Sequence, residues 1–149
     1  MEINGVAHVI LTVRSVERSR EFYVALLEHF GLTRVVDRPD YVYYVGGRTA
    51  VGLRPAAPEH EEALFDQTRS GLHHVCFRAR SREDVDSVHA LLQRIGGTIV
   101  HSPQEDGWVP GYYSVLFEDP DGIRLEVNHI PGKGVFEPGV ERKEIVGPR

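Results

Sequence analysis

The sequence has little cysteine and little lysine. Cys76 is the only cysteine, and lysine occurs only at positions 133 and 143 of the 149 residues. A single cysteine excludes an intrachain disulfide and a zinc site built from several thiolates. Binding to a phosphate backbone needs clustered lysine and arginine, so the scattered arginines and the net charge of −5 argue against a nucleic-acid partner.

Long hydrophobic runs are also absent. No stretch approaches the ~18 apolar residues that a membrane-spanning helix requires. The N-terminal residues lack the basic segment followed by an apolar segment that is typical of a signal peptide. We therefore expect no membrane partner and a cytoplasmic location, with which the single cysteine is consistent.

The chain contains an internal repeat. Residues 5–32 align without a gap on residues 71–98, an offset of 66 positions. The pairs of identical residues include Gly5 with Gly71, His8 with His74, Val9 with Val75, Leu26 with Leu92, and Gly31 with Gly97. Chance seldom gives so many ungapped matches, so we interpret the chain as two copies of one supersecondary unit.

Each copy has the pattern of a strand, a helix and three further strands. Ser15 and Ser81 are expected helix N-caps, and Gly31 and Gly96 are expected to end the helices. The later strands are expected at 33–37, 41–45 and 49–54 in the first copy, and at 98–101, 112–118 and 123–129 in the second. The expected fold class is therefore α+β, with two tandem βαβββ modules forming a cup-shaped mixed sheet. The boundaries we predict are a first module at 1–56, a linker at 57–70, a second module at 71–130 and an extended C-terminal tail at 131–149.

Strand alternation places chemically useful side chains on one face of each predicted sheet. His8 and His74 occupy equivalent positions on the first strand of each copy, and Glu126 lies on the polar face of the last strand. Two imidazoles and one carboxylate form a donor set for a divalent transition metal, as in the facial triad of non-haem Fe(II) oxygenases. Mn, Ni, Zn and Co suit the same donors. If the register of the strand is shifted by one residue, His73 replaces His74 as the ligand.

The doubled βαβββ pattern, the paired histidines and a DPDG turn followed four residues later by Glu126 carry a family resemblance. Over about residues 4–130 the chain resembles the vicinal oxygen chelate superfamily, which includes glyoxalase I, extradiol dioxygenases, methylmalonyl-CoA epimerase, and the fosfomycin and bleomycin resistance proteins. The resemblance implies that His8, His74 and Glu126 hold a metal that chelates vicinal oxygens of a small-molecule substrate. It also implies a homodimer, and in some members the modules pair between chains.

The chain departs from parts of the family pattern. Glyoxalase I and the epimerase take a fourth ligand from the last strand of the first copy, where this chain has Gly52 or a near neighbour. The three-ligand set resembles that of the extradiol dioxygenases, so the leading expectation is an extradiol-type dioxygenase with Fe(II) as the favoured metal. Leu116 stands where those enzymes have a tyrosine. The alternatives are a metal Lewis-acid lyase, isomerase or transferase of the glyoxalase type, and a metal-free antibiotic-binding resistance protein.

Other residues are candidates for contact with a substrate. Tyr112 and Ser114 share the predicted face of Leu116 and are the catalytic candidates. Tyr112 either positions the substrate or donates a proton, or it is a packing residue that lines the cavity. The candidate substrate-binding residues are Arg78, Arg124, Trp108 and Tyr43.

Overall fold

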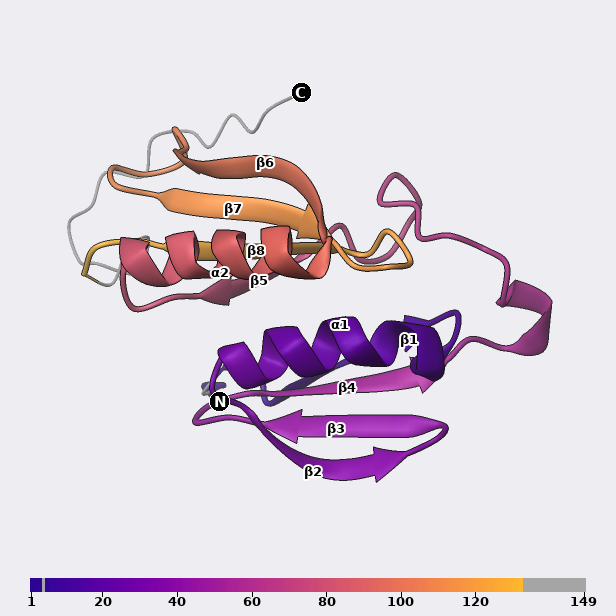
Figure 1. The fold of residues 1–149 in the computed structure, drawn as a ribbon. Helices are drawn as coiled ribbons and strands as arrows, with labels where there is room; N and C mark the ends of the chain where they lie inside the picture. The colour runs from indigo at the N-terminus through magenta and orange to yellow at the C-terminus, as the bar shows by residue number, and fades with distance from the viewer. Residues whose placement is uncertain (4, 133–149) are drawn as a thin grey trace. The chain divides into compact units, whose positions relative to one another are not determined.

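The computed structural model describes residues 1–3 and 5–132, which form two compact units (Figure 1). The described residues of the first unit lie within Met1–Asp66 and Pro120–Gly122, and those of the second lie within Gln67–Asp119 and 123–132. Most of the predicted tail, residues 133–149, lies outside the described residues.

The first unit is a four-stranded sheet with one helix on one of its faces (Figure 1). Its elements are β1 (His8–Val13), α1 (Val16–His29), β2 (Thr33–Arg38), β3 (Tyr41–Val45), β4 (Ala50–Pro55) and the short 3-10 helix η1 (Pro58–His60). The strand order is β1-β4-β3-β2, with β1 parallel to β4 and the other pairs antiparallel. Leu26 of α1 and Leu53 of β4 are fully buried in the apolar core of this unit.

The second unit repeats this architecture. Its elements are β5 (Val75–Arg78), α2 (Arg82–Ile95), β6 (Thr98–Glu105), β7 (Tyr113–Glu118) and β8 (Arg124–His129), and the strand order is β5-β8-β7-β6. The pairing register is repeated too, because Ile10 pairs with Gly52 in the first sheet and Cys76 pairs with Glu126 in the second. The expected α+β class and the tandem βαβββ arrangement are confirmed. Within the described ranges, neither α1 nor α2 is long and apolar enough to cross a membrane.

Local sequence signals set the ends of both helices. The Ser15 hydroxyl accepts a hydrogen bond from the Arg18 amide, and Ser81 forms a reciprocal capping box with Asp84. These bonds satisfy amides that have no partner inside the helix. α2 ends at Gly96, whose φ of 70° lies in the left-handed region that glycine adopts without steric cost.

Most predicted strand boundaries lie within one residue of the observed ones, and two of the differences affect the site. β6 continues to Glu105, four residues beyond the predicted end at His101. β6 contains Pro103, which has no N–H to donate, and an edge strand tolerates proline where the missing N–H would face solvent. The pairing of β6 with β7 shifts register twice. β7 begins at Tyr113, so Tyr112 lies just before the strand and not in it.

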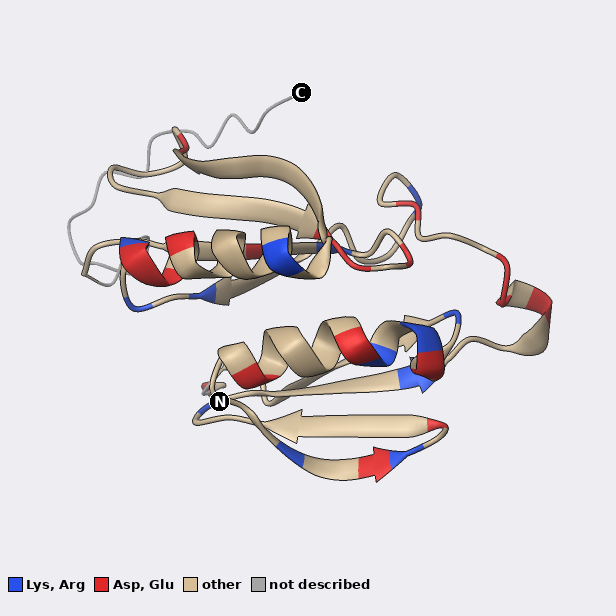
Figure 2. Ribbon diagram, in the orientation of Figure 1, with Lys and Arg blue, Asp and Glu red and all other residues tan. Residues whose placement is uncertain are grey.

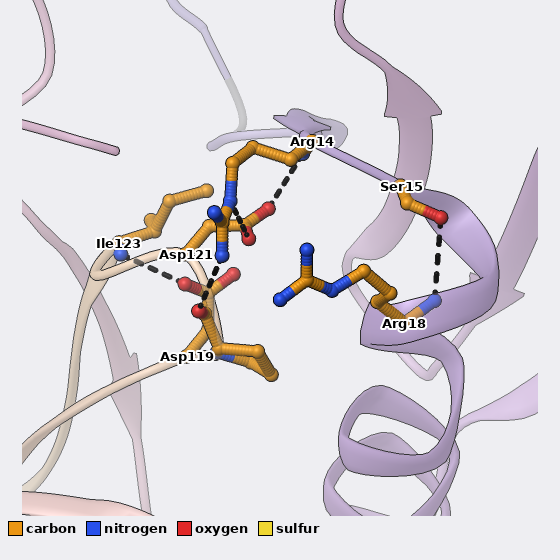
Figure 3. Close-up of polar contacts among 7 residues, drawn as sticks. Arg14, Ser15, Arg18, Asp119, Asp121 and Ile123 are labelled. Carbon is orange, nitrogen blue, oxygen red and sulfur yellow. Dashed lines mark hydrogen bonds and ion pairs between the residues drawn. The ribbon is translucent and has the colours of Figure 1, made fainter. Parts of the chain in front are cut away.

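The turn between β7 and β8 packs with the first unit (Figure 3). The Asp121 carboxylate accepts hydrogen bonds from the backbone amide and the Nε of Arg14, at 2.6 and 2.8 Å. Asp119 Oδ1 closes the turn by accepting from the Ile123 amide at 2.8 Å. The DPDG segment therefore does more than reverse the chain, because its second aspartate is the buried partner of a charged side chain.

Candidate functional site

Two of the predicted metal ligands lie together in the second unit. Glu126 is on β8, a central strand with β5 on one side and β7 on the other, and His74 immediately precedes β5. His74 Nε2 is 3.2 Å from Glu126 Oε2, and the two side chains are 35% and 10% exposed. The pair is thus accessible from solvent on the histidine side and enclosed on the carboxylate side.

Glu126 is held by several hydrogen-bond donors. Its Oε1 accepts a hydrogen bond from the Tyr112 hydroxyl, which leaves Oε2 facing His74. Burial alone would raise the pKa of Glu126. Hydrogen bonds from His74 and Tyr112, the positive charge of His74 and a hydrogen bond with Ser114 outweigh the burial, so the pKa lies below its ordinary value. The carboxylate is therefore ionised at neutral pH, as a metal ligand must be.

The groups beside Glu126 remain protonated. Burial, followed by the hydrogen bond to Glu126, raises the pKa of Tyr112 well above its ordinary value. Desolvation of the Cys76 thiol and the negative charge of Glu126 raise the pKa of Cys76 to about 12, although the residue as a whole is exposed. At neutral pH Tyr112 is therefore a neutral hydroxyl that donates a hydrogen bond, and Cys76 is a neutral thiol rather than the nucleophilic thiolate.

A second histidine lies beside the first. His73 Nδ1 and His74 Nδ1 are 2.8 Å apart, and the two rings meet edge to face. A histidine that binds a metal through Nε2 carries its proton on Nδ1 and usually donates that proton to a neighbour. His73 Nδ1 lies within hydrogen-bond distance to accept that proton when His74 carries it on Nδ1.

The geometry of the pair fits one edge of a metal coordination sphere. Two ligand atoms that are each ~2.1 Å from a cation and at right angles lie ~3.0 Å apart. The observed separation of 3.2 Å between His74 Nε2 and Glu126 Oε2 is close to that value. Nitrogen and carboxylate oxygen are also the donor types that divalent iron, manganese, nickel and zinc accept.

Asp106 is a member of this site that the sequence did not reveal. Ser114 is fully buried, and its hydroxyl donates to Asp106 Oδ2 at 2.8 Å. Ser114 also contacts Glu126, so one hydroxyl lies between two carboxylates. No sequence motif marks Asp106, because it comes from the loop after β6 and meets Ser114 only once β7 is in place.

The first unit carries the equivalent histidine but no equivalent carboxylate. His8 is exposed on the open face of β1, opposite Ala50. Gly52 stands where Glu126 stands in the second sheet. Within either unit, the described residues contain no cluster of three or more His, Cys, Asp and Glu side chains arranged to hold a metal ion.

Gly52 is required by close packing and not by backbone strain. A Cβ atom at this position would lie 2.7 Å from Cδ1 of Ile10 and 2.9 Å from Cδ2 of Tyr43. These side chains lie directly on the β4 backbone and occupy the space that a fourth ligand would need. A carboxylate at position 52 therefore cannot point from this face without displacing them.

Gly52→Ala is expected to destabilise the protein by about 1 kcal/mol, because the added methyl overpacks Ile10 and Tyr43. Urea unfolding followed by circular dichroism measures the change. Gly47→Ala is the matched control, since a Cβ atom there meets nothing within 4 Å. A Gly52→Ala variant as stable as wild type would contradict the close packing.

The predicted substrate-binding residues have different surroundings. Arg78 donates to the carbonyl oxygens of Ile130 and Gly132, at 3.1 and 2.7 Å, and so fixes the chain that leaves β8. Arg124 pairs with Glu118 at 3.1 Å. Trp108 is half-buried in the turn before β7.

Tyr43 lies on the open face of the first sheet. Its ring stacks on Tyr41, with the two centroids 5.9 Å apart. The two tyrosines share this face because they are two residues apart on one strand.

Comparisons with known proteins agree with this architecture. The sequence model described as "Glyoxalase/Bleomycin resistance protein/Dioxygenase superfamily" matches residues 5–127. The chain is similar to protein YqjT of Bacillus subtilis (strain 168), with 26% identity over 121 residues that cover 80% of this chain and 94% of YqjT.

Two solved structures are similar as well. One is a glyoxalase/bleomycin resistance protein from Albidiferax ferrireducens T118, with 28% identity, a TM-score of 0.68, and coverage of 83% of this chain and 98% of that one. The other is a glyoxylase/bleomycin resistance protein/dioxygenase domain from Frankia sp. EAN1pec, with 27% identity, a TM-score of 0.67, and coverage of 86% and 98%.

Proposed function

Since the chain belongs to the glyoxalase/bleomycin resistance protein/dioxygenase superfamily, we propose that it is a divalent-metal-dependent enzyme acting on a small oxygenated molecule. The observation that carries the proposal is the His74–Glu126 pair, an ionised carboxylate and an accessible imidazole nitrogen 3.2 Å apart. The proposed ligands are His74, Glu126 and His8, the repeat equivalent of His74. The proposed assembly is a homodimer.

The residues around the pair have separate roles in this proposal. When bound, the metal supplies Lewis acidity to vicinal oxygens of the substrate and, as Fe(II), a centre for oxygen chemistry. Tyr112 keeps its proton because its pKa is raised, and its hydroxyl positions the carboxylate by donating a hydrogen bond to Glu126 Oε1. Ser114, held by Asp106, limits the rotation of the carboxylate from the adjacent strand.

The subtype we propose is an extradiol-type dioxygenase. The support is the packing at Gly52. Ile10 and Tyr43 fill the space beside this glycine, so position 52 supplies no fourth ligand and the proposed set has three protein ligands. Three protein ligands leave open positions for both oxygens of a catechol and for O₂, as in other facial-triad oxygenases. A glyoxalase-type isomerase, by contrast, would take a fourth ligand, Glu or Gln, from position 52 or a near neighbour.

The test is elemental analysis of protein purified anaerobically without chelator, with His8→Ala as the control. Stoichiometric iron that is lost in the variant supports the dioxygenase, and oxygen uptake with added catechols then measures the activity. Stoichiometric manganese, nickel or zinc would replace the dioxygenase by a Lewis-acid lyase, isomerase or transferase. Protein that binds no metal even after reconstitution would overturn the proposal and favour an antibiotic-binding protein.

A further inference from the structure

The open face of the first sheet has three parallel rows of side chains, each running across the strands. Paired strand positions share a face, so the registers define the rows. His8 lies in the first row, Ile10 in the second and Thr12 in the third. Alternate residues along a strand are ~6.6 Å apart, so the first and third rows are ~13 Å apart.

The middle row is a flat apolar floor. It consists of Ile10, Gly52, Tyr43 and Val36. Because Gly52 has no side chain, Ile10 and Tyr43 lie directly on the β4 backbone. Ile10 remains 38% exposed, which is unusual for isoleucine and leaves apolar surface available to a ligand.

The third row is cationic. Arg38 of β2 pairs with Tyr41 of β3, and Arg54 of β4 pairs with Thr12 and lies over the Tyr41 ring. The guanidinium carbons of Arg38 and Arg54 lie 5.6 and 5.2 Å from the centre of the Tyr41 ring. A guanidinium held against an aromatic ring keeps its N–H groups available for an anion. Figure 2 shows that β4 carries charge only at its C-terminal end, where Arg54 lies.

The two arginines differ in whether a carboxylate balances their positive charge. Arg38 is 3.9 Å from the carboxylate of Asp40. Among the described residues, Arg54 makes no ion pair, and its guanidinium lies over the ring of Tyr41. The row therefore has one uncompensated positive charge, which matches a monoanion such as a carboxylate better than a phosphate dianion.

We propose that the ligand of this face is a small planar carboxylate, whose ring lies on Ile10 and Tyr43 and whose carboxylate is bound by Arg54. This ligand rests on the proposed function for one point only. If His8 is a metal ligand, the vicinal oxygens of the ligand lie beside the first row, which contains His8. A single ring with a substituent at each end spans part of the distance between the two rows, and the lengths of the His8 and Arg54 side chains account for the rest. The substrate class is thus a catechol that carries a carboxylate opposite its hydroxyls.

The test compares two probes that differ only in charge, 3,4-dihydroxybenzoate and 3,4-dihydroxybenzamide. Their affinities are measured by isothermal titration calorimetry on the full chain, both metal-free and reconstituted with metal. A hydrogen bond to a charged group predicts that the carboxylate binds roughly 10- to 100-fold more tightly than the amide. Arg54→Ala should remove this preference, and Arg54→Lys should retain part of it.

Arg94→Ala, on the exposed last turn of α2, is the control that removes the same charge elsewhere. Equal affinities, no measurable binding of either probe, or a preference that survives Arg54→Ala would overturn the inference. A protein that binds no metal but still prefers the carboxylate through Arg54 would overturn the proposed function and support the anion site. The two proposals therefore fail separately.

Discussion

Glu126→Ala is expected to abolish stoichiometric metal binding and to leave a folded protein. Glu126 is the carboxylate of the proposed ligand set, and without it only two neutral imidazoles remain to bind a dication. The fold should survive, because the core around β8 is formed by Leu125 and Val127 on the other face. Metal content by elemental analysis and metal titration of the apoprotein measure the loss, and circular dichroism measures the fold.

Glu105→Ala is the matched control for this experiment. Glu105 is also on a strand of the second sheet, but its side chain is 60% exposed and it pairs with Arg82. This variant should bind metal like the wild type. Stoichiometric metal in Glu126→Ala would show that Glu126 is no ligand, and the pair with His74 would then be a structural hydrogen bond.

Much of the fold could be predicted because the two copies inform each other. A histidine at the same place in both copies, with glycine after both helices, defines the unit better than either copy alone. Alternation along β8 predicted which side chains share the face of Glu126. Leu125 and Val127 are indeed buried on the opposite face.

The partners of individual side chains could not be predicted, since strand alternation gives a direction but no neighbour. Arg78 was predicted to bind a substrate, and in the structure it donates to the backbone carbonyls of Ile130 and Gly132. Asp106 carries no sequence signal, and its contact with Ser114 depends on the register of β6 against β7, which shifts twice. The position of a loop residue such as Asp106 depends on the path of the loop, and the residue periodicity that identifies helices and strands does not predict it.

The same limit applies to Asp121. The sequence identified its segment as a tight turn, for which Asp-Pro and Asp-Gly are sufficient explanation. Its partner Arg14 is 107 positions away, and no local rule connects the two. The function of the second aspartate in DPDG is therefore visible only in the folded chain (Figure 3).

Asp121→Ala is expected to reduce the free energy of unfolding by about 3 kcal/mol. The side chains of Arg14 and Asp121 are only 14% and 4% exposed, so the deletion leaves a largely enclosed guanidinium without this carboxylate. The backbone amide of Arg14 loses the same acceptor. Urea unfolding followed by fluorescence and by circular dichroism measures the change and tests whether the two probes report one transition.

A double-mutant cycle separates the ion pair from the rest of the effect. In the cycle of Arg14→Ala, Asp121→Ala and the double variant, the double loss should be smaller than the sum of the single losses, because each single change leaves one charge without its partner. The exposed Arg82–Glu105 pair, with side chains 41% and 60% exposed, is the comparison and should contribute no more than about 1 kcal/mol. Additive losses for Arg14 and Asp121 would mean that the two side chains stabilise the protein independently. The stabilisation would then come from the aspartate's bond to the Arg14 amide and from the turn itself.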